Sequence, residues 1–204
     1  MKRVIVSSMV LLLSLTGVVH AAGDAAAGEG KAAACAGCHG VDGNSMVPTF
    51  PNLAGQSEQY IAKQIADFKA GSTRTDATMS GMAMMLATEQ DALDVGAFYA
   101  TQTLNSTAPA DQSKLELGRE VYKGGNLTAG VPACQGCHGP TGKGNPAAGY
   151  PQLGGQFVEY TTKQLLAFKS GVRSNDDKAV MRNAVAAMTD AEIEAVAHYI
   201  ASLK

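Results

Sequence analysis

Bulky side chains are scarce in this sequence. None of its 204 residues is tryptophan, and all aromatic residues together account for 5%. Basic residues do not outnumber acidic ones either, because 16 lysines and arginines stand against 18 aspartates and glutamates. A nucleic-acid-binding protein would show a basic face, so we expect no nucleic-acid partner. The thin supply of aromatic side chains favours a fold in which a large apolar cofactor helps to fill the interior.

Long apolar runs are also scarce, and the clearest one lies at the start of the chain. Lys2 and Arg3 precede a largely apolar stretch over residues 4–19, and the small residue Ala21 follows it closely. This pattern is typical of a secretory signal peptide, since a membrane-spanning helix needs about 20 apolar residues. We predict that residues 1–21 are a signal peptide removed on export to the periplasm. An uncleaved membrane anchor is the alternative.

Charge is unevenly divided along the rest of the chain. Residues 22–108 carry four basic and nine acidic side chains, whereas residues 109–204 carry ten and nine. The molecule is therefore expected to have a dipole along its long axis, which would orient it on a charged partner. Divergence between two copies of a duplicated segment would give the same asymmetry without such a role.

An internal repeat organises the chain. A Cys-x-x-Cys-His-Gly motif begins at Cys35 and again at Cys134. Downstream of the first motif, these residues recur 100 positions later: Pro51, Leu53, Gly55, Gln56, Tyr60, Lys63, Gln64, Phe68, Lys69, Gly71 and Tyr99. A repeat unit of this length is a domain. We predict two tandem domains over residues 22–108 and 109–204, joined within the polar residues 101–113.

Each repeat has a helical pattern, so the predicted fold class is all-α. Apolar residues fall on one helix face over residues 60–68 and 157–168, and Gly71 and Gly171 follow at C-cap positions. A Thr-x-x-Asp box at Thr88 and a Thr-x-x-Glu box at Thr189 predict the starts of two further helices. Helices over residues 25–34 and 115–123 precede the two cysteine motifs. No alternating strand pattern of useful length occurs.

The Cys-x-x-Cys-His motifs carry the chemistry. Two thiols three positions apart can attach to one haem, and the histidine that follows is held under the iron as an axial ligand. We predict two covalent haem c groups, attached through the following residues: Cys35, Cys38, Cys134 and Cys137, with His39 and His138 as ligands. Two disulfides, a zinc site and a thioredoxin-like redox pair are the alternatives. Disulfides leave both histidines unexplained. A zinc site needs cysteine pairs closer together in the sequence, and a thioredoxin-like pair needs β-strands that the sequence does not show.

Too few histidines are present for a second histidine ligand at both irons, and methionine is the natural alternative. Downstream of residue 21 only three histidines remain, and the third is His198, which stands where the first repeat has a phenylalanine. Met181 is the candidate in the second repeat, because Met188 directly precedes the helix cap. Histidine and methionine together raise the reduction potential of a haem iron.

The first repeat offers several methionines close together. We favour Met79 as the ligand, with Met82 next and with Met84 and Met85 left open. Counting back from the following helix cap supports Met79 if Ala87 is a one-residue insertion. Most methionines at such spacing are packing residues, so one member of the group is enough.

Pro51 and Pro151 follow the two motif histidines at a nearly fixed distance. A backbone carbonyl at that turn would accept the Nδ1 proton of the histidine and so fix its tautomer. A plain turn proline is the alternative, and the spacing does not separate the two interpretations.

Taken together, these segments resemble the cytochrome c4 family. The resemblance rests on Ala-Gly-Asp at 22–24, Phe-Pro-Asn-Leu-Ala-Gly-Gln at 50–56, Tyr-Pro-Gln-Leu-Gly-Gly-Gln at 150–156 and Phe-Lys-Ser-Gly at 168–171, besides the two motifs. It implies two class I cytochrome c domains related by a pseudo-twofold axis, each enclosing one haem with a histidine and a methionine ligand. It also implies respiratory donors and a haem-copper terminal oxidase as partners. The methionine-rich residues 79–85 depart from the family.

The expected function is therefore electron transfer and not catalysis. We predict a dihaem carrier that moves single electrons between respiratory donors and a terminal oxidase or reductase, and a loose association with the membrane surface stays open. A dihaem subunit of a flavocytochrome-like dehydrogenase is the alternative, and a dihaem peroxidase is a weaker one because both repeats offer a methionine. The acidic first domain is expected to hold the haem of lower potential.

Overall fold

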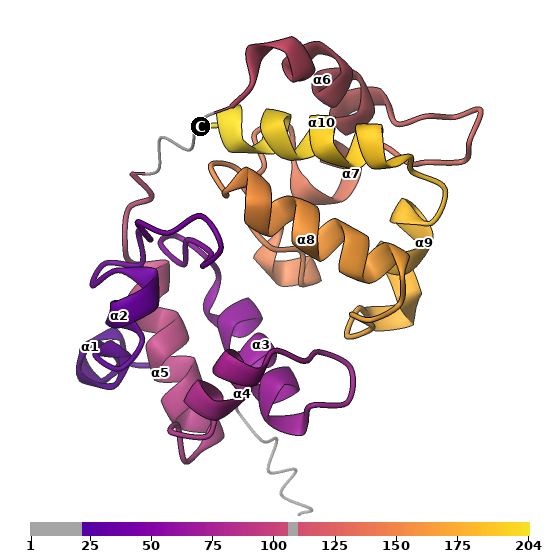
Figure 1. The fold of residues 1–204 in the computed structure, drawn as a ribbon. Coiled ribbons are helices and arrows are strands. Elements are labelled where there is room, and N and C mark those ends of the chain that lie inside the picture. The colour runs from indigo at the N-terminus through magenta and orange to yellow at the C-terminus, as the bar shows by residue number, and fades with distance from the viewer. Residues whose placement is uncertain (1–21, 106–109) are drawn as a thin grey trace, which may run out of the picture.

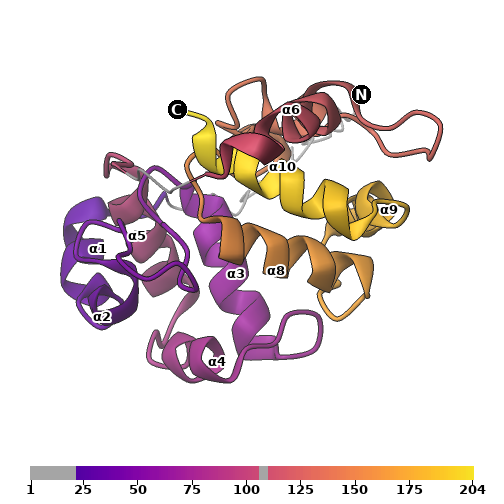
Figure 2. The same ribbon diagram turned by 45° about the horizontal axis from the view of Figure 1, so that its top comes forward.

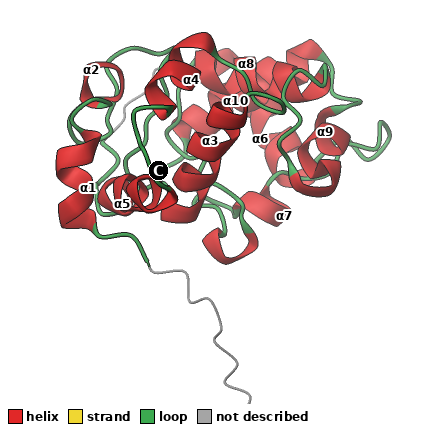
Figure 3. Cartoon of the chain, turned by 90° about the horizontal axis from the view of Figure 1, so that it is seen from below, coloured by secondary structure: helices red, strands yellow, loops and turns green. Residues whose placement is uncertain are grey.

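The computed structural model describes residues 22–105 and 110–204, and both stretches are helical (Figure 1). Within them no β-strand forms, and the only pairings of extended backbone are two isolated bridges in the second half (Figure 3). No helix among these residues is both long and apolar enough to span a membrane. The predicted all-α class is thus confirmed, while the predicted signal peptide lies outside the described residues.

The first domain consists of five helices: α1 (Ala25–Ala32), α2 (Ala36–His39), α3 (Glu58–Ala70), α4 (Ala77–Ala83) and α5 (Glu89–Ala100). Its local signals act as the sequence predicts. Thr88 and Asp91 form a reciprocal capping box at the start of α5, and Gly71 ends α3 with a φ of 64°. Helices α1 and α3 both pack on α5, and the buried residues between them include Ile61, Phe68 and Val95.

The second domain repeats this order with α6 (Leu115–Gly124), α7 (Gln135–His138), α8 (Val158–Lys169), α9 (Val180–Val185) and α10 (Asp190–Ser202). A short 3₁₀ turn, η1 (Gln112–Lys114), precedes α6, and two more, η2 (Pro146–Ala148) and η3 (Asp177–Ala179), lie before α8 and α9. Thr189 and Glu192 form the predicted capping box of α10. Helices α6 and α8 pack on α10 as α1 and α3 pack on α5.

One glycine permits the closest helix crossing in each domain. A Cβ added to Gly28 of α1 would lie 1.9 Å from the carbonyl oxygen of Asp94 in α5. A Cβ added to Gly118 of α6 would lie 2.1 Å from the carbonyl oxygen of Ala195 in α10. Real atoms do not approach so closely, so the first and last helices of each domain touch backbone to backbone.

Helices α3 and α8 run on the facing sides of the two domains (Figures 1 and 2), and side chains join the domains there. Arg74 and Arg173, each 6% exposed, lie in this interface. Arg74 donates to the hydroxyl of Tyr160 at 2.9 Å, and Arg173 donates to the hydroxyl of Tyr60 at 3.1 Å. Each arginine therefore reaches across to the tyrosine of the other domain, as a pseudo-twofold relation requires.

Candidate haem-binding sites

The motif histidine of each domain is buried and fixed in orientation. His39 ends the short helix α2, is 5% exposed, and has its Nδ1 2.8 Å from the carbonyl oxygen of Pro51. His138 ends α7, is also 5% exposed, and has its Nδ1 3.0 Å from the carbonyl oxygen of Pro151. Since a carbonyl only accepts, Nδ1 carries the proton in both rings and Nε2 is the nitrogen left for a metal.

Burial also sets the protonation state of both rings. It lowers the pKa of His39 and of His138, although the prolyl carbonyls oppose this shift. The neutral imidazole that results is the form that coordinates a metal. The residue before each proline places an aromatic ring near the histidine. The ring centroids are 6.3 Å apart for Phe50 and His39, and 5.9 Å apart for Tyr150 and His138.

The four motif cysteines are partly buried and free of disulfides. Burial raises the pKa of the Cys35 thiol and raises that of Cys134 to about 11. A thioredoxin-like nucleophile would instead have a lowered thiol pKa. Within residues 22–105 and 110–204, no group of three histidine, cysteine or acidic side chains could hold a metal ion. The arrangement speaks against disulfide, redox-pair and zinc roles.

The methionines of the first domain occupy different environments. Met79 lies on α4 and packs against the same buried core as Cys35. Met84 and Met85 point outward with 67% and 64% exposure, and Met82 is half-buried. Of the four candidates, Met79 thus shares the interior of the domain with the cysteine motif.

The second domain has the same arrangement. Met181 lies on α9 and packs against the same buried core as Cys134. Met188 is 3% exposed within that core, as a packing residue would be. Lys178 and Ala179, just before α9, have left-handed φ angles of 50° and 58°. Residues without a glycine's freedom adopt this conformation at a cost, so the segment that delivers Met181 is held under backbone strain.

The residues present fit a covalent haem. Each domain joins two free thiols, a neutral buried imidazole with a free Nε2, and a thioether in one interior, which is the donor set of a c-type haem. Tyr99 is fully buried and packs with Cys35, and its hydroxyl interacts with the Cys35 thiol. A haem attached to Cys35 would therefore lie beside this tyrosine.

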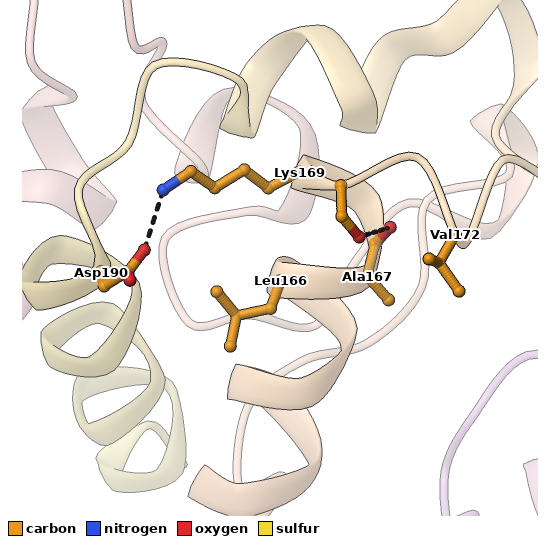
Figure 4. Close-up of a pocket in the computed structure, with 6 residues that line it drawn as sticks. Leu166, Ala167, Lys169, Val172 and Asp190 are labelled. Carbon is orange, nitrogen blue, oxygen red and sulfur yellow. Dashed lines mark hydrogen bonds and ion pairs between the residues drawn. The ribbon is translucent and has the colours of Figure 1, made fainter.

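Other features of the second domain do not belong to this site. A surface hollow lined by Leu166, Val172 and the Lys169–Asp190 ion pair at 2.8 Å lies beside the C-terminal end of α8 and contains no motif residue (Figure 4). His198 accepts a hydrogen bond at Nδ1 from the backbone of Asp111 at 3.0 Å. It therefore ties the start of the second domain to α10, as expected of a packing residue.

Comparison with known proteins decides the family. The family model described as cytochrome c matches residues 25–102 and again 115–204. Cytochrome c4 of Stutzerimonas stutzeri is 47% identical over the full length of both chains. The chain belongs to the cytochrome c4 family. A crystal structure of reduced recombinant cytochrome c4 from Pseudomonas stutzeri is 46% identical, covers 90% of this chain and 100% of that one, and has a TM-score of 0.85.

Membership in the cytochrome c4 family establishes two haem c sites on two cytochrome c domains. The protein is a non-enzymatic electron carrier, so the peroxidase alternative is excluded. A third relative, the thiosulfate dehydrogenase electron acceptor of Thiomonas intermedia, is 35% identical over 99% of this chain and 94% of its own length.

Proposed function

We propose that the chain is a periplasmic carrier that takes single electrons from a respiratory donor complex and passes them to a haem-copper terminal oxidase or a reductase. The observation that carries this proposal is that each domain offers a methionine from the same core as its motif cysteine, Met79 with Cys35 and Met181 with Cys134. Two strong axial ligands keep the coordination fixed in both oxidation states. A carrier needs this, whereas a catalyst needs an open position.

The proposed ligand pairs are His39 with Met79 and His138 with Met181. The haem supplies a reversible one-electron change at its iron. The chain holds the haem through the four motif thiols, excludes water from it, and orients the two imidazoles through Pro51 and Pro151. The two histidines have equivalent surroundings, which supports the same ligand type in both domains.

The visible spectrum of the fully reduced protein, with and without carbon monoxide and with haem counted per chain, tests the ligands. Two haems and no spectral change on adding carbon monoxide are expected, because both irons are closed. A Met79→Ala variant should bind carbon monoxide at one haem, and Met84→Ala, a matched change at an exposed position, should not. Binding at one haem of the unmodified protein would overturn the proposal.

The partners call for a kinetic test. Oxidation of the reduced protein by membrane vesicles that contain a haem-copper oxidase is expected to be fast, to stop with cyanide, and to slow as salt screens the acidic first domain. The periplasmic location is tested on the exported protein, whose first residue should be Ala22. A cyanide-insensitive or absent oxidation would remove the terminal oxidase as the partner.

A second candidate function is to accept electrons from one dedicated dehydrogenase. The likeness to a thiosulfate dehydrogenase electron acceptor favours it. Reduction of the protein by a purified thiosulfate dehydrogenase with thiosulfate, faster than by respiratory membranes with quinol, would favour this candidate over the first.

A further inference from the structure

A pair of glutamine side chains crosses the domain interface and binds backbone on the other side. Gln156 accepts from the N–H of Asn52 at 3.0 Å and donates to the carbonyl oxygen of Asn52 at 3.0 Å. Gln56 does the same to Gln152, accepting from its N–H at 3.0 Å and donating to its carbonyl oxygen at 3.0 Å. Because the contacts are to backbone, they tolerate asparagine at 52 and glutamine at 152.

Both glutamines are held firmly in place. The Oε1 of Gln156 also accepts from the N–H of Phe157, and the Oε1 of Gln56 from the N–H of Ser57, each at 3.1 Å. Asn52 and Gln56 are buried, at 5% and 8% exposure, while Gln152 and Gln156 are half-buried. Each of these hydrogen bonds is therefore partly shielded from water and contributes more than a fully exposed one would.

The peptide group that each glutamine binds is the one that orients a motif histidine. The carbonyl of Pro51 and the N–H of Asn52 belong to a single peptide group. Its oxygen lies 2.8 Å from Nδ1 of His39, while its N–H donates to Gln156. In the second domain, the peptide between Pro151 and Gln152 links His138, at 3.0 Å, to Gln56 in the same way.

Hydrogen bonds that follow one another through a single peptide group strengthen one another. When the N–H of a peptide donates, electron density shifts to its carbonyl oxygen, which becomes a better acceptor. A stronger bond from Nδ1–H makes the imidazole a stronger electron donor at Nε2, and this favours the oxidised iron. Each glutamine should therefore lower the reduction potential of the haem whose histidine it reaches.

We propose that Gln56 and Gln156 are positioning residues that act in a crossed manner: Gln156 of the second domain tunes the haem held by His39, and Gln56 of the first domain tunes the haem held by His138. This inference rests on the proposed axial roles of the two histidines. Docking of the domains then sets both potentials, because separation would remove both glutamines.

The crossed effect provides a sharp test. In Gln156→Leu, a redox titration that follows the assigned haem signals of each domain by NMR should show a higher potential for the first-domain haem. A two- to tenfold change in the equilibrium constant of reduction is expected, which is about 20 to 60 mV for one electron. The second-domain haem, which lies in the same domain as the substitution, should stay unchanged.

Three further variants complete the test. Gln56→Leu should raise the potential of the second-domain haem alone. Gln156→Glu keeps an acceptor for the N–H of Asn52 and should leave the first-domain potential at or below its original value. Tyr160→Phe removes a different hydrogen bond between the domains, the one from Arg74, and should move neither potential, which separates the effect from mere loosening of the interface.

The outcomes distinguish this inference from the ligand assignment beneath it. Unshifted potentials, a shift in the haem of the substituted domain, or equal shifts in both haems would overturn the inference while the two-haem spectrum stays intact. A wrong histidine assignment would instead appear in the His39→Ala variant, which would retain an unaltered low-spin spectrum. The exchange rate of the Nδ1 proton of His39 should also rise in Gln156→Leu and not in Tyr160→Phe.

Discussion

Removing the hydrogen bond between Arg173 and Tyr60 should weaken the association of the two domains by a measurable amount. Arg173 is 6% exposed and its guanidinium stacks on the ring of Phe168 at 4.4 Å from the centroid. It donates within its own domain at 2.7 Å to Gln164, and across the interface at 3.1 Å to both Tyr60 and Gln64. One nitrogen, Nη2, serves both bonds across the interface.

The magnitude follows from these contacts. A hydrogen bond to a charged group contributes about 1.5–3 kcal/mol. Because Nη2 is shared between two acceptors, we expect the lower half of that range, about 1.5–2 kcal/mol, for the Tyr60 contact alone. The charges of Arg173 and Arg74 outweigh burial and lower the pKa of Tyr60, which shows that its hydroxyl lies in the positive field of both arginines.

A double-mutant cycle isolates this contact. The free energy of unfolding in guanidinium chloride is measured for the unmodified protein, for Arg173→Met, for Tyr60→Phe and for the pair, with helicity and haem absorbance recorded together. A parallel cycle of Arg173→Met with Tyr122→Phe, whose hydroxyl bonds Gly139 in the second domain, should give a coupling below about 0.5 kcal/mol. A coupling that small between Arg173 and Tyr60 would refute the reasoning.

Three further predictions follow from local geometry and charge. Gly28→Ala should lower the free energy of unfolding by about 1–3 kcal/mol because α1 must move off α5. Gly30→Ala, on the same helix with open space around it, should instead raise the free energy of unfolding by about 0.5–1 kcal/mol. The backbone N–H of Asp24 and the ammonium of Lys31 lower the pKa of Asp94 to about 2. The stability that this carboxylate contributes is therefore full above about pH 4 and is lost as pH falls through about 2. In acid titrations followed by circular dichroism, this pH-dependent loss should be absent in Asp94→Asn. In a redox titration with assigned haems, the acidic first domain should hold the lower potential, and the reverse order would show that local contacts outweigh net charge.

Much of the fold could be predicted from the sequence because its signals are local. The capping boxes at Thr88 and Thr189 and the glycine that ends α3 act through neighbouring residues, so a short window of sequence contains the whole interaction. The Cys-x-x-Cys-His motifs are equally local. The two prolyl carbonyls follow the histidines by only 12 and 13 residues.

The contacts between the domains could not be predicted in this way. Arg74 and Arg173 have equivalent places in the interface, yet they are 99 positions apart, and a search for residues that recur after 100 positions misses them. Gln56 and Gln156 do recur, but their partners lie 96 and 104 residues away. Nothing in a local pattern shows that an amide side chain will bind the backbone of another domain.

The methionine ligand of the first domain shows the same limit. Four methionines stand close together in the sequence, and only burial separates Met79, which packs with the core, from Met84 and Met85, which do not. Met79 lies on α4, whereas Met84 and Met85 follow its end, and the sequence does not show where this short helix stops or which face it packs on.

The crossed glutamine contacts are arranged as in the interface of a symmetric dimer. Each domain offers both a glutamine and the backbone that the other glutamine binds, so a single surface is complementary to a second copy of itself. Such a surface would bring two separate domains together only at sufficient concentration. Joining them in one chain replaces that dependence with a high effective concentration, so the paired state persists however dilute the protein becomes.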